Sequence, residues 1–263
     1  MDRIDVTNSA FWSHLNRLGK CNLNLQLPTC SFRSTVDLWG AHLVDQNLLI
    51  PNAGLSLRTT EFANVFTNES PLRLLFNSDH RRFGFTLSPI EEPGCKRARF
   101  FIKAFTVDTD KPLGEILSVE EPRLCPCCVD AAHFRIQRLA QNPLTRILAD
   151  SIERDLSLII SSGNDDGRLT FLHTPISLRK EGASLISIGE NQRLCIDVRH
   201  LHAMHSGQQE IDGETYQSLT LLNSHGGINC SLSLPSSKVG NIWNQIFNDY
   251  DHYYQPSRSN PNW

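Results

Sequence analysis

Residues 52–66, NAGLSLRTTEFANVF, and residues 191–205, NQRLCIDVRHLHAMH, follow the same pattern. Each begins with a short run in which apolar and polar residues alternate, as Leu55 and Leu57 do in the first copy. A basic residue and then a less regular, partly apolar stretch follow in both copies. Alternation with a period of two is typical of a half-buried β-strand. The two segments therefore predict one β-rich unit that occurs twice.

A second pair of segments supports the duplication, because it follows the first pair in the same order. Residues 99–105 (RFFIKAF) and 217–223 (QSLTLLN) each resemble a strand that runs into a turn and a further strand. We therefore expect these two strands to be counterparts. Two degenerate copies predict a pseudo-twofold protein, in which a ligand commonly binds at the junction of the copies.

Helical patterns separate and flank the two copies. Residues 9–18 fit a short helix, and residues 129–140 look helical. Apolar residues at helical spacing then run to about residue 160 behind Asn142 and Pro143, which suit an N-cap and a first helical position. A last helix is expected over residues 237–250.

The sequence thus predicts an α+β fold, built as a tandem duplication of an antiparallel β-sheet unit with helices between and flanking the repeats. Its expected parts are residues 1–124, a first β-rich repeat with an N-terminal helix; residues 125–162, a central helical segment; and residues 163–263, a second β-rich repeat with a C-terminal helix.

The whole-chain composition disfavours several classes of protein. The 263 residues carry a net charge of −3 with an isoelectric point near 6.4, so no basic excess attracts nucleic acid. No stretch approaches the roughly 20 apolar residues of a membrane helix. The N-terminus lacks the basic and apolar layout of a secretory signal. The eight cysteines are irregularly spaced and are interpreted as reduced thiols, so we expect a cytoplasmic protein.

Cys125, Cys127 and Cys128 lie within four residues and are the densest group of soft metal ligands in the sequence. Three thiols suit zinc or copper(I), or two of them can form one redox pair. A structural zinc site normally has a fourth ligand, and His133 follows closely enough to be a candidate. A linker whose thiols have neither a metal nor a redox role is the other interpretation of this cysteine cluster.

His200, His202 and His205 form a His-x-His-x-x-His pattern. On a strand the first two would share one face and could bind a metal, whereas a polar strand edge would give the same pattern. His173 is interpreted as the end of a strand. The sequence has no G-x-S-x-G, P-loop, dinucleotide-binding or H-E-x-x-H motif, so no common catalytic motif assigns an enzyme class.

Several short motifs resemble those of one protein family. They are residues 158–164 (LIISSGN), 169–176 (LTFLHTPI) and 193–197 (RLCID) in the second half, and 54–58 (GLSLR) in the first. In their order the sequence resembles the bacterial cytoplasmic haemin-degrading and haem-trafficking proteins, over about residues 36–235. The resemblance implies the same duplicated fold and haem as the ligand.

The resemblance also implies site residues. In this family a histidine ligates the haem iron and an arginine follows thirteen residues later, which is the spacing of His133 and Arg146. Arg58 falls where the family has another haem-facing arginine. A neutral imidazole suits iron, and the planar guanidinium of arginine pairs with a haem propionate. Cys125-Pro126 also resembles a Cys-Pro haem-regulatory motif, in which the thiolate takes the iron.

The function implied is that of a cytoplasmic haem-binding protein that carries or buffers imported haem. Degradation of haem with release of iron is a further activity, for which the sequence identifies no catalytic residue. A haem importer or a reductase would be a partner, and the oligomeric state is not indicated. The alternative is a regulatory or interaction protein of the same fold without haem, in which the cysteine cluster is a metal or redox switch. Thr60, which stands where the family has an aromatic residue, favours this alternative.

Overall fold

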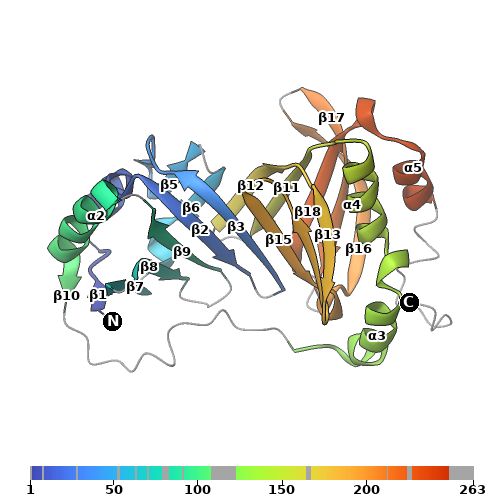
Figure 1. The fold of residues 1–263 in the computed structure, drawn as a ribbon, viewed down its shortest axis with the longest axis horizontal. Coiled ribbons are helices and arrows are strands. Elements are labelled where there is room, and N and C mark those ends of the chain that lie inside the picture. Colours follow the sequence, from blue (N-terminus) through green and yellow to red (C-terminus); the bar gives the residue numbers. More distant parts are fainter. Residues whose placement is uncertain are drawn as a thin grey trace. The chain divides into compact units, whose positions relative to one another are not determined.

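The computed structural model divides into two units of antiparallel strands, each with its own helices (Figure 1). Unit 1 comprises Met1–Glu120 with Gly163–Thr170, and unit 2 comprises Glu121–Ser162 with Phe171–Trp263. The residues described by the structure are 2–7, 9–27, 29–51, 54–62, 64–69, 71–78, 83–90, 92–107, 123–163, 167–211, 213–223 and 227–248. No helix in these ranges has the length and the apolar character that a membrane span requires.

Unit 1 contains a broad sheet and a smaller group of strands. The neighbours in the broad sheet are, in order, β10 (Thr106–Val107), β1 (Asp2–Ile4), β7 (Asn64–Glu69), β8 (Leu72–Asn77), β9 (Gly84–Pro89), β2 (Lys20–Gln26) and β3 (Cys30–Asp37). The smaller group is β4 (His42–Val44), β5 (Asn47–Ile50) and β6 (Leu55–Arg58), with the first residues of β12 (Gly167–His173) antiparallel to β6. The helical elements are α1 (Ser9–Ser13), η1 (Leu15–Leu18), η3 (Thr59–Glu61) and α2 (Glu92–Phe105).

An aromatic cluster holds α1 and α2 against the sheet of unit 1. Phe76 of β8 and Phe85 of β9 are cross-strand partners, and their rings stack with centroids 4.2 Å apart. Phe11 of α1 stacks on Phe101 of α2 at 5.6 Å and also lies 6.3 Å from Phe76. Each such pair stabilises the fold by about 0.5–1.5 kcal/mol beyond the burial of its apolar area. These rings therefore join the two helices to the strands.

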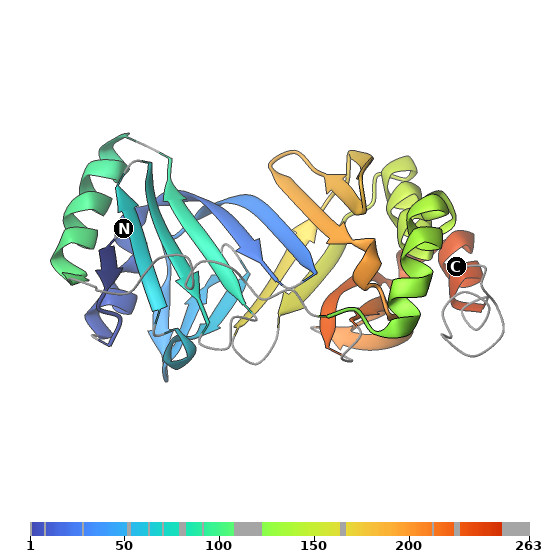
Figure 2. The same cartoon turned by 90° about the horizontal axis from the view of Figure 1, so that it is seen from below.

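Residues 99–105 are helical, which corrects the strand predicted from the sequence. They form the second half of α2, beside the strands of unit 1 (Figure 2). Ala98, Phe101 and Ile102 are at positions i, i+3 and i+4 and are buried, whereas Phe100 faces solvent. Phe101 is 3% exposed and Phe100 is 79% exposed. One buried and one exposed phenylalanine in adjacent positions also fit the alternation of a strand. The burial of residues at positions i, i+3 and i+4 is the pattern of a helix.

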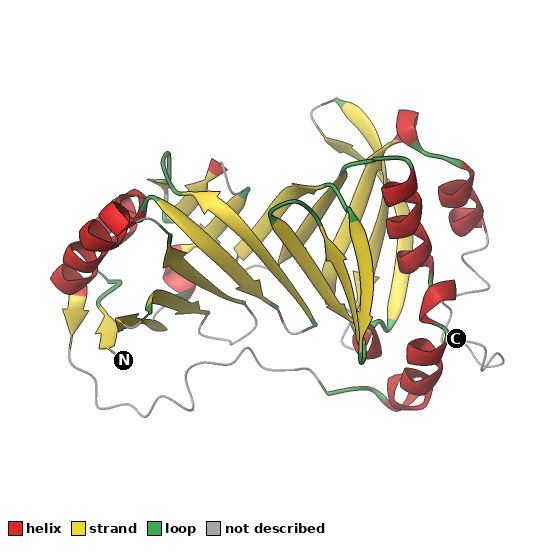
Figure 3. Ribbon diagram, in the orientation of Figure 1, coloured by secondary structure: helices red, strands yellow, loops and turns green. Residues whose placement is uncertain are grey.

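Unit 2 is also built of antiparallel strands, with helices beside them (Figure 3). One antiparallel meander is β13 (Ser177–Glu181), β14 (Ser184–Ile188) and β15 (Gln192–Asp197). A second is β16 (Ala203–Ile211), β17 (Glu214–Leu222) and β18 (Ile228–Pro235), with β11 (Leu158–Gly163) antiparallel to β18. The helical elements are α3 (Pro126–Gln137), η5 (Leu139–Gln141), α4 (Pro143–Glu153), η6 (Val198–His200), η7 (Ser236–Lys238) and α5 (Asn241–Asn248).

The shared topology of the two units confirms the predicted duplication. The meander β4–β6 corresponds to β13–β15, and a 3-10 turn follows each, η3 in unit 1 and η6 in unit 2. The meander β7–β9 corresponds in the same way to β16–β18. The segments 52–66 and 191–205 are therefore equivalent, because they contain β6 with η3 and β15 with η6. Residues 217–222 lie in β17, whose counterpart is β8 and not residues 99–105.

The central helix begins where the sequence predicts and ends earlier. The side-chain oxygen of Asn142 accepts the backbone N–H of Leu144 at 2.9 Å, and Pro143 opens α4. The helix ends at Glu153 rather than near residue 160, because Asp155 has a φ of 50° and turns the chain toward β11. The last helix is also shorter than predicted, since α5 begins at Asn241 after the separate turn η7. Residues 249–250 lie outside the described residues.

Two adjacent phenylalanines of α2 test this packing. We expect Phe101→Ala to lower the free energy of unfolding by about 3–5 kcal/mol, because it removes a buried ring from the aromatic cluster. The matched control Phe100→Ala changes the same residue type on the same helix and should cost less than about 0.5 kcal/mol. Urea denaturation of the full chain measures both values. Equal losses of unfolding free energy in the two variants would contradict the burial of Phe101 and the exposure of Phe100.

Candidate functional site

The three thiols of the cysteine cluster gather at the start of α3. Cys125 is the N-cap residue, with an extended backbone (φ −69°, ψ 159°), and Pro126 occupies the first turn. Proline disfavours a helical conformation in the residue before it and suits the first helical position, so Cys125-Pro126 fixes where α3 begins. The sulfur atoms of Cys125 and Cys127 are 2.8 Å apart. Cys128 is buried, whereas Cys127 is exposed.

His202 brings an imidazole to these thiols from a distant part of unit 2's sequence, 74 residues after Cys128. It follows η6, and its backbone N–H donates to the carbonyl oxygens of Leu222 at 2.8 Å and His200 at 2.9 Å. Its Nδ1 lies 3.3 Å from the sulfur of Cys125, 3.7 Å from that of Cys127 and 3.3 Å from that of Cys128. All four donor atoms lie within 4.8 Å of one another. We call this group the Cys3His cluster.

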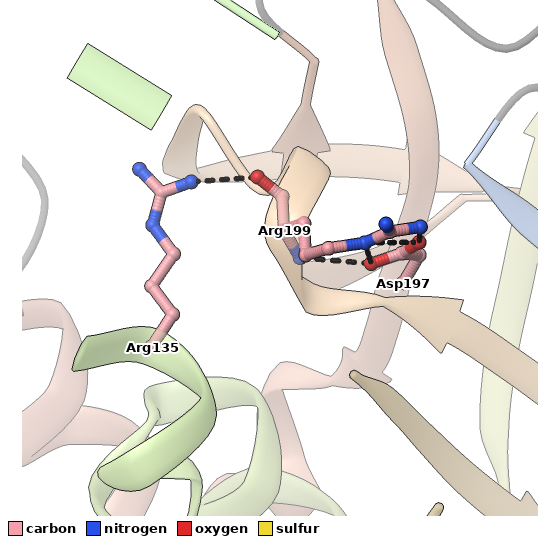
Figure 4. A network of polar contacts seen from close by, with 3 residues as sticks. All are labelled: Arg135, Asp197 and Arg199. Carbon is pink, nitrogen blue, oxygen red and sulfur yellow. Dashed lines mark hydrogen bonds and ion pairs between the residues drawn. The ribbon is translucent and has the colours of Figure 1, made fainter. Parts of the chain in front are cut away.

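A buried arginine, Arg135, contacts the Cys3His cluster on its buried side. Arg135 lies seven residues after Cys128, on the same face of α3, and is buried. One of its terminal nitrogens donates to the sulfur of Cys128 at 3.3 Å and to the backbone oxygen of Arg199 at 3.0 Å. Arg199 is itself fixed by Asp197, whose carboxylate accepts from the Arg199 backbone at 2.9 Å and from its Nε at 3.0 Å (Figure 4). The first turns of α3 are thereby connected to η6, immediately before His202.

The pKa is lowered for the Cys125 thiol and the His202 imidazole, whereas burial raises the pKa of the Cys127 and Cys128 thiols. Burial acts to raise the pKa of the Cys125 thiol, but hydrogen bonds from Cys127 and Cys128 and the charge of Arg135 outweigh it and leave that pKa below its ordinary value. Burial raises the pKa of Cys127 to about 11, and its bond to Cys125 adds to the rise. Burial lowers the pKa of His202, and the charge of Arg135 lowers it further. The cluster therefore offers one readily formed thiolate and a neutral imidazole.

The structure places His133 away from the cysteine cluster. The structure begins α3 at Pro126, so His133 is in its middle, exposed to solvent. The histidine that completes the group of thiols is His202 rather than His133. Five helical steps from Cys128 rotate a side chain by about 140°, which directs His133 away from the face that carries Cys128 and Arg135. The side-chain amide of Gln137 donates to its Nε2 at 2.7 Å.

The two arginines implied by the resemblance lie in different units. Arg146 is half-buried on α4, and its guanidinium donates to the side-chain oxygen of Gln245 on α5 at 2.9 Å. Arg58 is the last residue of β6 in unit 1 and is exposed.

The His-x-His-x-x-His pattern does not lie on one strand. His200 is buried in η6, and β16 begins only at Ala203, so the backbone between His200 and His202 turns. His202 reaches the thiols, while His205 is exposed on β16. His173 ends β12 and is fully buried, with Nε2 2.8 Å from the hydroxyl of Ser187, which indicates a structural role.

Unit 1 contains a groove that the sequence analysis did not identify. It has a volume of about 990 Å³ and lies among η1, the start of β2 and α2. Arg17, Lys20, Lys96 and Arg97 line it, together with the exposed rings of Trp39 and Phe100. On a helix, Lys96, Arg97 and Phe100 fall on one face. Because residues 99–105 were predicted to form a strand, this shared face was not recognised from the sequence.

His14 adds an imidazole to the basic groove. Its Nδ1 donates to the carbonyl oxygen of Ala10 at 2.8 Å. A carbonyl accepts only, so the hydrogen is on Nδ1 and the lone pair of the neutral ring is on Nε2. The groove thus combines cations, aromatic faces and a base, which suits an amphipathic anion.

No protein-family model and no curated protein sequence matches this chain. Solved structures match its fold. ChuS of Escherichia coli O157:H7, a heme degrading enzyme, matches with a TM-score of 0.68 at 12% sequence identity, over 95% of this chain and 86% of ChuS. Apo-PhuS, a heme-binding protein from Pseudomonas aeruginosa, matches with a TM-score of 0.70 at 10% identity, over 95% of this chain and 86% of that one.

These matches are too distant in sequence to carry over a function, and they establish the architecture. The duplicated α+β fold predicted from the sequence is the fold of ChuS and PhuS, and this chain shares it over nearly its whole length.

Proposed function

We propose that this protein binds haem and carries or buffers it. The observation that supports the proposal most is the likeness in fold, over 95% of the chain, to a heme degrading enzyme and a heme-binding protein. Haem requires an apolar surface, an axial donor and cations for its two propionates. Residues of α3 and α4 supply groups of each kind.

His133 is the proposed axial ligand. Its exposed imidazole already accepts a hydrogen bond at Nε2 from Gln137, so in that contact the nitrogen presents the lone pair that iron requires. Val129 and Phe134 lie beside it on α3 and are 58% and 38% exposed. Apolar side chains that gather on an exposed helix face favour a surface that a ligand covers. A porphyrin bound through His133 would cover them.

Arg146 is the proposed partner of one propionate. Its described contact is with the neutral amide of Gln245, which leaves its positive charge available for a carboxylate. An arginine and a carboxylate can form two parallel hydrogen bonds, which is stronger than the present single bond to an amide. The family resemblance assigns the same role to Arg58, and the Arg58→Ala variant tests that role separately.

The basic groove of unit 1 is the competing location. His14 would be the axial donor there, and Arg17, Lys96 and Arg97 would meet the propionates. We favour α3 because the family resemblance assigns the ligand to His133, and the experiment below distinguishes the two locations.

We expect one haemin to bind per chain, with His133→Ala altering the Soret and visible bands because the axial nitrogen is lost. The measurement is an absorbance titration of the full chain. His205→Ala is the matched control, since it removes another exposed histidine of unit 2. Its spectrum should equal that of the unsubstituted protein.

Each other outcome of the titration has a defined meaning. If His133→Ala leaves the bands unchanged and His14→Ala alters them, haem binds in the groove of unit 1. A change with Cys125→Ser or His202→Ala instead would assign the iron to the Cys3His cluster. The absence of any Soret shift in the unsubstituted protein would refute haem binding. Addition of ascorbate and oxygen to the complex tests for degradation, which would bleach the Soret band and release iron.

Arg146→Ala and Arg58→Ala should each weaken haem binding by about 1–3 kcal/mol, the usual value of a charge-assisted hydrogen bond. Both variants should lose less affinity for haem dimethyl ester, because the ester has no carboxylate to pair. Arg179→Ala, which removes an exposed arginine of β13, is the control and should bind both compounds normally. Equal losses for haem and its ester would show that the arginines are not propionate partners.

A further inference from the structure

We propose that Cys125, Cys127, Cys128 and His202 form a tetrahedral zinc site that holds the start of α3 against the segment between η6 and β16. The site lies within unit 2 and does not include His133, Arg146 or Arg58. Zinc binding can therefore be tested separately from haem binding. Three thiolates and one imidazole are a common ligand set of structural zinc sites.

The distances in the Cys3His cluster suit a single small ion. Around tetrahedral zinc, neighbouring sulfur and nitrogen ligands lie about 3.4–3.8 Å apart. The nitrogen of His202 lies 3.3, 3.7 and 3.3 Å from the three sulfurs. The 2.8 Å between the sulfurs of Cys125 and Cys127 is shorter, so zinc would require them to separate by about 1 Å. Cys127 is exposed and has room for that adjustment.

The charges around the cluster also balance for zinc. Three thiolates and one zinc ion together carry one negative charge. Arg135 is buried, and its described hydrogen bonds go to the sulfur of Cys128 and to a backbone oxygen rather than to a carboxylate. A buried cation without an opposite charge is strongly unfavourable. A zinc-bound thiolate at Cys128 supplies that charge, and this explains why an arginine is buried here.

The helix itself contributes to the stability of the thiolates. The N-terminal end of a helix carries a partial positive charge and exposes backbone N–H groups, and both lower the energy of a nearby anion. Cys125 is the N-cap residue of the 12-residue α3, and the backbone N–H of Cys128 donates to the carbonyl oxygen of Cys125 at 2.9 Å. His202 is 74 residues from Cys128 in sequence, so an ion would join two distant segments of unit 2.

Zinc binding is tested on the full chain, reduced and freed of metal, by competition with a chromogenic chelator. We expect one zinc ion per chain. Cys128→Ser and His202→Ala should each weaken zinc binding by more than about 100-fold, beyond the loss that an outer-shell partner causes. Cys195→Ser and His205→Ala remove a thiol and an imidazole of unit 2 outside the cluster and should bind zinc normally. His133→Ala should also bind zinc normally, even if it loses haem.

Cobalt(II) provides a measurement that needs no variant. Bound to the unsubstituted chain, it should show the intense visible bands of a tetrahedral ion and the near-ultraviolet bands of thiolate ligands. Absence of zinc binding, or equal zinc affinity in His202→Ala and the unsubstituted chain, would overturn the proposal. So would weak octahedral cobalt bands. A reduced chain that binds no zinc, but forms a Cys125–Cys127 disulfide when oxidised glutathione is added as the electron acceptor, would assign the cluster to redox chemistry instead.

Discussion

The site of unit 2 depends on the hydrogen bonds that the buried guanidinium of Arg135 donates. The guanidinium bonds at once to the sulfur of Cys128 on its own helix and to the backbone of Arg199 in η6. Asp197 fixes Arg199, and the chain then turns so that His202 faces the thiols. The duplicated fold places η6 after the meander of unit 2, as it places η3 after that of unit 1. In unit 2 His202 follows this turn and supplies one of the four donors, and the three thiols at the start of α3 supply the others.

Helix α3 carries two different chemistries on separate faces. Its first turn and the face of Arg135 hold the buried side of the Cys3His cluster, whereas His133 is rotated by about 140° from Cys128 and lies in solvent between exposed apolar side chains. A metal at the first face would stiffen the helix from which the second face presents its imidazole. The proposed haem site and the proposed zinc site use different residues of this helix, so one molecule can hold both ligands.

The sequence predicted the parts of the fold whose signals are local. The alternation at Leu55 and at Leu194 marks β6 and β15, and Asn142-Pro143 marks the start of α4, because each of these signals arises within a few residues. Residues 99–105 were misread, since Phe100 and Phe101 fit both periods and only packing on Phe11 selects the helix. The thiols were found for the same local reason. Their histidine was not, because nothing in a sequence connects Cys128 to a residue 74 positions away.

The start of α3 and the segment after η6 together present three thiols and one imidazole to a single ion. X-ray absorption at the zinc edge of the full chain, loaded with one equivalent of zinc, measures the ligands of that ion. We expect about three sulfur neighbours at ~2.3 Å and one nitrogen neighbour at ~2.0 Å. In His202→Ala the nitrogen contribution should be replaced by a water oxygen or another light atom. A first shell made only of nitrogen and oxygen atoms in the unsubstituted protein would show that the thiols do not bind zinc.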